Sequence, residues 1–412
     1  MDQSAQQAQE EVIGLGEDWR LVEALLPDRW MEMARELGAF QRARGIADAR
    51  ALLRVMLIHL GEGCGLRETA ARATLAGIAQ VSDVALLKRL RSCGPWFEWL
   101  AQALRAAPEL CSAQQSAGPQ GLLGGRQLRV VDGSIVREPG PTGSQWRLHY
   151  AIGLPGLQCQ EVHLGPCDEG ETLKRFAVRP GDIFMADRGY AHPGGIAHVR
   201  RHGGDVIVRM NLVTLPLMDP ATGQPLDVLQ QVRGLQVGQA GSWPALLKVK
   251  AERGGQRAQE IAGRLCAVRK SAAAAVLGRE RVRRESMRGR TQVQPQTLEA
   301  AEYVLVFTTL EPRVEAAQVL ALYRLRWQIE LEFKRLKSLI QLGHLKKRDA
   351  RAARSWLQGK LLVALLIARL IAHAERVSPW GYEIAWFTAP TRALSVARDL
   401  ADARPAVPLR RA

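Results

Sequence analysis

The chain has 412 residues, of which 47% are hydrophobic and 24% are charged, a composition typical of a globular protein with a substantial buried core. Its 57 Lys and Arg residues outnumber 41 Asp and Glu residues, and the resulting net charge of +16 attracts nucleic acid or an anionic membrane. The longest apolar run, 361–368, is far shorter than the roughly 20 residues needed to span a membrane, so the sequence predicts nucleic acid as partner.

The beginning of the chain and the cysteines indicate where the protein works. The first thirty residues carry seven Asp and Glu against two Arg, unlike a signal peptide. The six cysteines are scattered without a C-x-x-C pair, which disfavours structural zinc and indicates reduced thiols. We expect a cytoplasmic, nucleoid-associated protein that does not enter a membrane.

The first part of the chain, 1–115, is expected to be a helical DNA-binding domain. Apolar residues recur there at spacings of three and four. Residues 66–90 resemble a helix–turn–helix, with Gly77 at the break and Ser82 as a candidate cap. Two ordinary packed helices would give the same pattern, so both interpretations stay open. Residues 116–127, rich in Gly and Gln, are expected to be a linker.

Strand and helix patterns alternate after the linker, which predicts a mixed α/β layer structure over 128–211 and 301–377. Between these two parts, residues 212–300 have Gly and Pro turns and short strand patterns, and are expected to be a β-rich insertion. A helix over 355–377 is expected to cover the sheet, and 378–412 to be a C-terminal tail. The expected strands lie at 128–136, 146–154, 158–165, 181–190, 205–211 and 303–310.

One basic segment, 323–337, lacks Gly and Pro and is predicted to form a continuous helix. At about 100° per residue, Tyr323, Arg326, Glu330 and Lys337 would fall within an arc of about 60° beside an apolar flank. An ordinary i,i+4 ion pair between Arg326 and Glu330 is the alternative explanation for the acid among these bases.

Two aspartates, Asp132 and Asp187, each follow an apolar strand pattern and precede residues suited to a turn. Side chains at strand ends of an α/β sheet project into the crevice where ligands bind. Together with Glu330 they could hold two Mg²⁺ ions for phosphodiester chemistry, since Mg²⁺ prefers carboxylate oxygens. Sets of three carboxylates are common by chance, so placement alone leaves this assignment open.

The order Y-x2-R-x3-E-x6-K at Tyr323 to Lys337, within "IELEFKRLKS", resembles the signature of the IS-four family of bacterial DDE insertion-sequence transposases. "VDGSI" at Asp132 and "ADRGY" at Asp187 resemble the two Asp motifs of that family, and so do "WRLHY", "ETLKRF" and "DVIVRMN" around them. The resemblance covers roughly 35–375.

The resemblance implies an RNase H-like (ribonuclease H-like) catalytic domain, interrupted by the insertion within the 143 residues between Asp187 and Glu330. It implies that Asp132, Asp187 and Glu330 are the catalytic residues and hold two Mg²⁺ ions, with Mn²⁺ as a substitute. It also implies that Arg326 and Lys337 contact phosphates beside the cleaved bond and that Tyr323 positions the strand.

Other residues are candidates for DNA contact on sequence signals that are less specific than the family motif. Some family members flip a base onto an aromatic residue of the strand before this helix, and Tyr303 stands where a tryptophan is more typical; core packing is the alternative. Arg188 and Arg209 follow strand patterns and are candidates for phosphate contact or for simple solvation. Residues 264–290 carry nine Arg and Lys against two Glu, a pattern suited to tracking a phosphate backbone.

The sequence thus predicts a transposase that binds double-stranded DNA at terminal inverted repeats, cleaves at the element ends and joins the 3′-hydroxyls to target DNA, acting as a dimer in a synaptic complex. Two alternatives remain open at this point. One is a non-catalytic or domesticated DNA-binding regulator with the same fold. The other is an RNase H-like nuclease without strand transfer.

Overall fold

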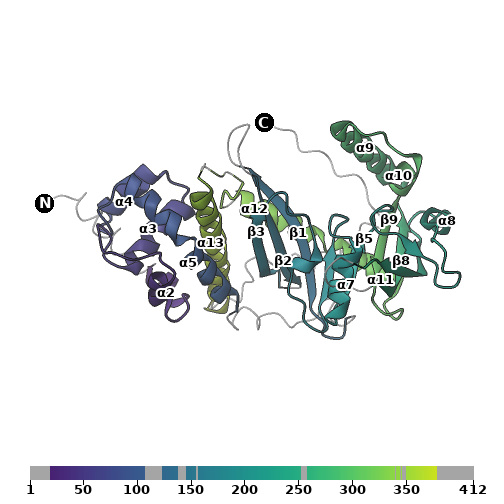
Figure 1. Ribbon diagram of the computed structural model, residues 1–412, viewed down its shortest axis with the longest axis horizontal. Helices are drawn as coiled ribbons and strands as arrows, with labels where there is room; N and C mark the ends of the chain where they lie inside the picture. Colours follow the sequence, from purple (N-terminus) through teal and green to yellow (C-terminus); the bar gives the residue numbers. More distant parts are fainter. Residues whose placement is uncertain are drawn as a thin grey trace.

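The computed structural model describes residues 19–106, 123–137, 145–154, 156–251, 258–338, 340–343, 345 and 349–377. The predicted tail and most of the predicted linker lie outside these residues. The described part is a mixed α/β structure built around one large sheet, as the sequence predicts. Figure 1 shows the helical end of the molecule beside the sheet, with α13 between them.

The N-terminal part is helical. Helices α4 and α5 are those of the predicted helix–turn–helix, and they are separated where the sequence indicated. Gly77 has a φ of 64°, a left-handed conformation that favours glycine, and the Ser82 hydroxyl accepts a hydrogen bond from the Ala85 amide at 3.2 Å. The helices of this part include α2 (Trp30–Glu36), α3 (Ala49–Gly61), α4 (Leu66–Leu75) and α5 (Asp83–Ala106).

The long helix α13 (Ala350–Val377) packs against α5 and α3 and reaches the sheet at β3 (Gln158–Pro166). It therefore lies between the N-terminal helices and the sheet, and the prediction that it covers the sheet was only partly right. The side chain of Leu60 on α3 packs directly on the backbone of α13, because a Cβ on Gly359 would lie 2.4 Å from a methyl carbon of Leu60. Its stretch Ala350–His373 is long and apolar enough to cross a membrane, yet 67% of its most apolar window is buried inside the protein, as in a core helix.

The sheet of the described residues has nine strands in the order β3-β2-β1-β4-β5-β9-β8-β7-β6. Strands β1, β4 and β5 run parallel to one another, and the other neighbours pair antiparallel. Besides β3, they are β1 (Leu128–Arg137), β2 (Gln145–Leu154), β4 (Ile183–Ala186), β5 (Asp205–Arg209), β6 (Leu217–Met218), β7 (Ala240–Val249), β8 (Gln259–Arg269) and β9 (Tyr303–Thr308).

Hydrophobic residues cover both faces of this sheet. Because side chains alternate along a strand, Val130 of β1 belongs to one core and Val131 to the other. Helices α11 (Ala316–Arg324) and α12 (Trp327–Ser338) cover the Val130 face together with α13, and α7 (Pro193–Arg201) covers the Val131 face. The short 3-10 helix η2 (Leu173–Arg175) packs beside α7.

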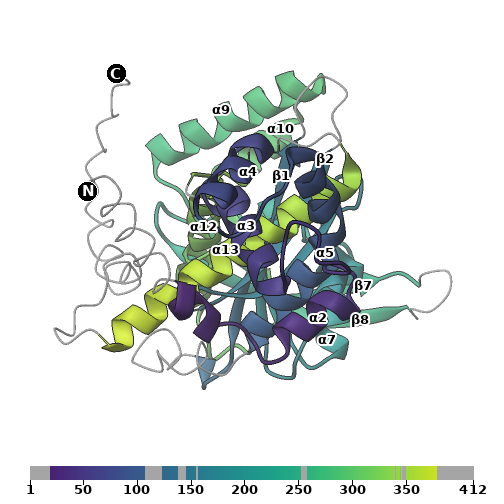
Figure 2. The same cartoon turned by 90° about the vertical axis from the view of Figure 1, so that its left-hand side faces the viewer.

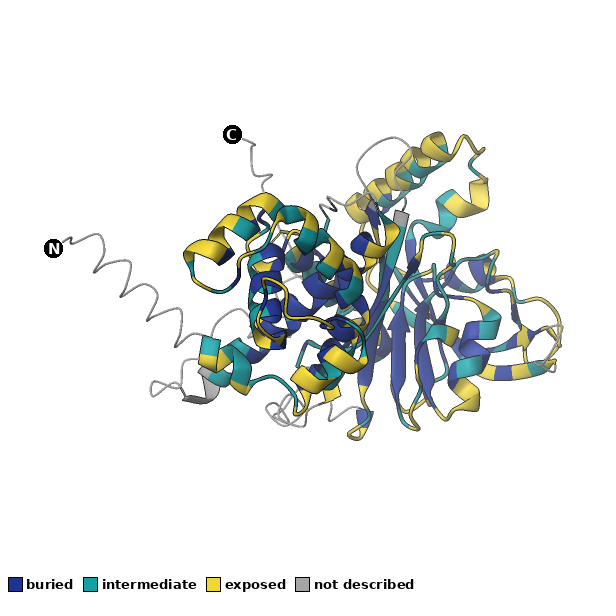
Figure 3. Cartoon of the chain, turned by 60° about the vertical axis from the view of Figure 1, so that its left-hand side comes forward, coloured by how far each residue is buried: buried dark blue, intermediate teal, exposed yellow. Residues whose placement is uncertain are grey.

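The segment 212–300 does not form a separate sheet, since its strands β6, β7 and β8 extend the main one next to β9. It also holds the helices α8 (Val228–Val232), α9 (Ala272–Gly289) and α10 (Pro295–Ala300). The basic stretch 279–290 was expected to belong to the β-rich insertion. It lies largely in α9 instead, and the Ser271 hydroxyl caps the N-terminus of this helix. Only Ala275 of α9 is buried, and Figures 2 and 3 show this helix standing out from the body with an exposed outer face.

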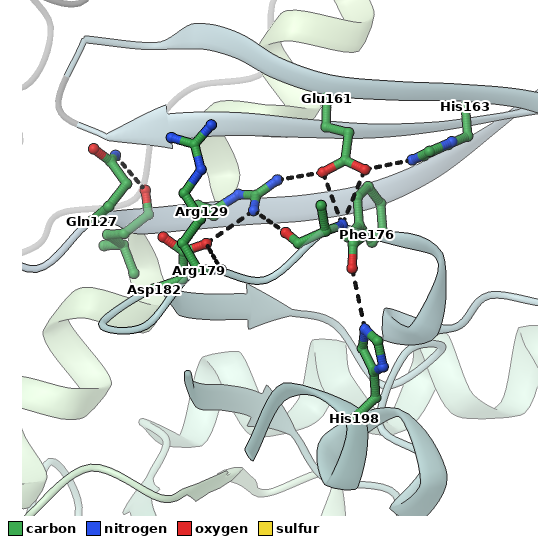
Figure 4. Close-up of polar contacts among 10 residues, drawn as sticks. Gln127, Arg129, Glu161, His163, Phe176, Arg179, Asp182 and His198 are labelled. Carbon is green, nitrogen blue, oxygen red and sulfur yellow. Dashed lines mark hydrogen bonds and ion pairs between the residues drawn. The ribbon is translucent and has the colours of Figure 1, made fainter. Parts of the chain in front are cut away.

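A buried arginine fixes the edge of the sheet opposite the carboxyl ends of β1 and β4. The Arg129 side chain is 7% exposed and binds Glu161 of β3 at 2.6 Å and Asp182 before β4 at 3.0 Å. Its guanidinium also lies 4.6 Å from the ring centre of Phe184, and Figure 4 shows the network. Because buried charges are tolerated only when paired, this arginine ties β1, β3 and the loop before β4 into one unit.

Replacement of Arg129 by Ala should destabilise the protein by about 3–5 kcal/mol, since it leaves the buried Asp182 and the half-buried Glu161 without their arginine. Urea unfolding followed by circular dichroism measures this change. Arg179→Ala is the matched control, because its side chain is exposed and only its backbone amide binds Asp182. Equal stability of the two variants would contradict this account of the network.

Candidate active site

The sheet register places Asp132 and Asp187 side by side. The parallel pairing of β1 with β4 ends at the pair Val131 and Ala186, and the residue after each of these is an aspartate, Asp132 or Asp187. Neighbouring strands lie about 4.8 Å apart, and by alternation both side chains leave the sheet on the α12 face. The expectation that Asp132 ends its strand was wrong, because β2 continues to pair with β1 beyond it, Asp132 opposite Tyr150. Asp187 does follow the last residue of β4.

The two carboxylates affect each other electrostatically. Burial, and next the negative charge of Asp187, raise the pKa of Asp132 to about 7. Backbone amides point at both groups: Gly133 donates to Oδ1 of Asp132 at 2.7 Å, and Gly189 donates to Oδ1 of Asp187 at 2.8 Å. The pair therefore forms a concentrated negative site that favours a cation.

Arg326 is the cation nearest to this pair. Its guanidinium lies 3.5 Å from Oδ2 of Asp132 and also binds the carboxylate of Glu330, while 17% of its side chain is exposed. The same group lies 6.0 Å from the ring centre of Tyr323. Four of the predicted site residues, Asp132, Tyr323, Arg326 and Glu330, thus meet beside Asp187, and the i,i+4 pair of Arg326 with Glu330 is present as well.

The predicted continuous helix over 323–337 is broken in the structure. Helix α11 ends at Arg324 and α12 begins at Trp327. The amides of Leu325 and Arg326 bond three residues back, to Leu322 and Tyr323, so a tight turn replaces the regular α-helical spacing. The calculated arc of 60° is therefore wrong, although Arg326 in this turn still reaches both Asp132 and Glu330. Lys337 lies exposed about two turns beyond Glu330 on α12.

The remaining predicted DNA-binding residues have different surroundings. Arg188 follows Asp187 and is exposed, but its guanidinium binds Glu285 of α9 at 2.7 Å. Arg209 ends β5 and is half-buried. Tyr303 is 4% exposed within the core of the α7 face, with Arg269 about 6.0 Å from its ring centre. The ring of Tyr303 thus packs in the core, which was the alternative weighed for it.

Sequence reasoning missed a second layer of polar residues behind the aspartates. Glu171, just before η2, binds Arg147 of β2 at 3.3 Å. The ring of His149 is fully buried and its Nδ1 lies 2.8 Å from the hydroxyl of Tyr190. The sequence signal was the "ETLKRF" stretch, which begins with Glu171 and contributed only to the family resemblance.

The carboxylates fit a hard divalent cation in chemistry but not yet in arrangement. Among the described residues no three His, Cys, Asp or Glu side chains converge closely enough to hold a metal ion. Arg326 lies between Asp132 and Glu330 and forms an ion pair with each. The oxygen donors of Asp132, Asp187 and Glu330 are of the type that Mg²⁺ prefers, and a shared ion requires Arg326 to release them.

Comparison with known proteins decides the family. A family model described as transposase DDE domain matches residues 124–366. The chain belongs to the IS-four type of DDE transposases. It is 37% identical over 352 residues to the transposase of insertion sequence element IS421 from Escherichia coli, which covers 84% of this chain and 91% of that protein.

A similar relationship holds for InsL of element IS186A from Escherichia coli strain K12, to which transposase function is ascribed. The identity is 37% over 351 residues, with 84% of this chain and 91% of the relative covered. The chain is therefore a transposase of an insertion sequence, which acts in DNA transposition, and the family prediction made from the sequence is confirmed.

Without divalent metal, Asp132→Asn should stabilise the transposase at neutral pH. A raised pKa means that the folded state keeps a proton that the unfolded chain has lost, so wild-type stability falls as pH rises between about 4 and 7. The Asn variant has no such proton to lose. Its free energy of unfolding should therefore exceed that of the wild type by an amount that grows from about pH 4 to pH 7, reaches on the order of 1–4 kcal/mol and then levels off. Thermal unfolding in a chelating buffer measures it, with the exposed Asp168→Asn as control; a pH-independent difference would contradict the assignment.

Proposed function

We propose that this transposase binds the terminal inverted repeats of its element, cleaves the phosphodiester bond at each end and joins the freed 3′-hydroxyls to target DNA. The observation that carries the proposal is that Arg326 pairs with both Asp132 and Glu330, while the register of β1 and β4 sets Asp187 beside Asp132. The alternative functions inferred from the sequence become outcomes of the test below.

An RNase H-like catalytic core is supported by the sheet. Its first five strands have the order β3-β2-β1-β4-β5, with a meander of antiparallel strands followed by parallel β4 and β5. The segment 212–300 interrupts this core as an insertion that extends the sheet. We propose that 1–115 form the DNA-binding helical domain, that 116–127 link it to the core at 128–211 and 301–377, and that 378–412 form a tail.

Asp132, Asp187 and Glu330 would hold two Mg²⁺ ions, or Mn²⁺ in their place. When bound, the ions activate the attacking water or 3′-hydroxyl and stabilise the leaving oxygen. For this, Asp132 gives up the proton that its raised pKa retains, and Arg326 leaves the two carboxylates. The released guanidinium is then free for the phosphate beside the cleaved bond, next to Tyr323.

The DNA interface would continue from this site along α12 and α9. Lys337 is exposed on α12, and Arg188 and Arg209 lie at the ends of β4 and β5, the same edge of the sheet as the aspartates. The guanidinium of Arg188 forms an ion pair with Glu285, so a DNA phosphate would have to compete with the Glu285 carboxylate for it. A base-stacking role for Tyr303 would require its buried ring to be uncovered. The exposed arginines of the α9 region are Arg281, Arg283, Arg284, Arg288 and Arg290.

The setting of the reaction is proposed from the two element ends and from the charge of the chain. Transposition at two element ends calls for a synaptic complex, and we propose a dimer. Action on chromosomal DNA and the net charge of +16 support a cytoplasmic, nucleoid-associated protein without a membrane segment.

Replacement of Glu330 by Gln should lower Mg²⁺-dependent cleavage of DNA carrying the element's own ends by at least about 100-fold, because one metal ligand loses its charge. Gel analysis of labelled ends, with and without Mg²⁺, measures nicks and joined products. The control is Glu332→Gln on the same helix, whose carboxylate binds Arg335 at 3.5 Å instead.

The outcomes separate the three functions. Binding of the ends by the wild type without nicks or joined products would indicate a DNA-binding regulator. Nicks without joined products would indicate a nuclease. Equal cleavage by both glutamine variants would contradict the role assigned to Glu330.

The double replacement of Arg283 and Arg284 by Ala should weaken DNA binding at all sequences. No carboxylate among the described residues pairs with these two exposed side chains. If each neutralises one phosphate, the slope of log K against log salt should become shallower by about 2. The matched control is Lys248→Ala with Lys250→Ala, two exposed cations on or next to β7, away from α9. An unchanged slope would exclude α9 from the interface.

A further inference from the structure

Glu171 is a fourth carboxylate at the site, on the opposite face of the sheet from Glu330. Its side chain, 25% exposed, binds Arg147 of β2 at 3.3 Å. Arg147 lies on the same face as His149 and Ala151, since the intervening residues, Leu148 and Tyr150, belong to the core under α12 and α13. Glu171 is therefore held behind the aspartates by a partner from the neighbouring strand.

The carboxylate of Glu171 touches the backbone that carries both aspartates. A Cβ on Gly133, the residue after Asp132, would lie 2.8 Å from Oε1 of Glu171. A Cβ on Gly189, two residues after Asp187, would lie 1.9 Å from Oε2. No residue other than glycine leaves room for this carboxylate at either position without a shift. The two glycines thus let one side chain reach both turns at once.

Those glycines are also the residues whose amides orient the aspartates. The amide of Gly133 donates to Asp132 and the amide of Gly189 donates to Asp187. Glu171 consequently packs, from the opposite face of the sheet to Glu330, against the two residues whose amides bind the candidate catalytic carboxylates. Its negative charge adds to that of the two aspartates and makes the site still more favourable for a cation.

We infer that Glu171 is a positioning residue of the active site, which holds Asp132 and Asp187 in place for a divalent cation through Gly133 and Gly189. The inference rests on the proposed function, because it concerns the same metal site. Outer residues that orient metal ligands typically change metal affinity by about 10- to 100-fold when replaced.

The test is Mn²⁺ binding to the full-length protein, followed by the electron paramagnetic resonance signal of free Mn²⁺, with thermal unfolding of each variant in a chelating buffer. Glu171→Ala should weaken Mn²⁺ binding at least about tenfold. Glu171→Gln, which keeps the shape and a hydrogen bond to Arg147, should recover part of that loss. Glu169→Ala is the matched control: this acid lies two residues away and binds Arg175 at 2.7 Å instead of the glycines.

A second variant approaches the same contact from the other side. Gly133→Ala should displace Glu171 and weaken Mn²⁺ binding as Glu171→Ala does, since the backbone of Gly133 is not in the left-handed region and the atom nearest to its added Cβ is Oε1 of Glu171, at 2.8 Å. The double variant should then bind Mn²⁺ no more weakly than either single variant. Additive losses would overturn the inference, because they would show that the two residues act separately.

The outcomes distinguish this inference from the function on which it rests. If the wild type does not bind Mn²⁺, the proposed metal-dependent function fails and the role of Glu171 fails with it. If the wild type binds Mn²⁺ and both Glu171 variants bind equally well, or lose only thermal stability, the role of Glu171 alone is overturned.

Discussion

The mutual repulsion of Asp132 and Asp187 is the constraint around which the rest of the site is arranged. The register of β1 and β4 forces two partly buried carboxylates onto neighbouring positions. Such a pair is stable only with protons or cations close by. In the structure the cation is Arg326, brought to the pair by the turn between α11 and α12, and Glu330 arrives with it through their ion pair.

Distant parts of the chain serve this arrangement. Arg264 of β8 is 8% exposed and binds the carbonyl oxygens of Leu310 and Glu311 at 3.3 and 2.9 Å, which anchors the connection from β9 to α11. Arg129 fixes the opposite edge of the sheet, where β1 and β4 begin. The insertion therefore contributes more than a surface: its strand β8 helps to place the helices that carry Arg326 and Glu330.

Much of the site could be predicted because the family motif links residues that are far apart in the sequence. The alternation of strands and helices indicated the mixed α/β sheet, and the signature identified the helix that carries Glu330. Periodicity alone could not show the break at Leu325 and Arg326, since that turn is set by tertiary contacts and no Gly or Pro marks it. Glu171 was missed because it packs against two glycines, Gly133 and Gly189. The absence of a side chain at these positions produces no sequence pattern, and its importance shows only once the folded backbone places the glycines beside Glu171. The helical state of α9 was missed because its basic composition gives weak periodicity.

The position of α13 has a further consequence. Leu60 and Phe97 of the N-terminal helices, Leu362 of α13 and Val130 of the sheet belong to one continuous apolar interior. The helices that we propose to recognise the element ends are therefore not a detachable module on a flexible tether. Evolution of a new recognition specificity in this lineage has to proceed by changes on the outer surface of those helices, because exchange of the whole N-terminal part would strip the interior that the catalytic sheet shares with it.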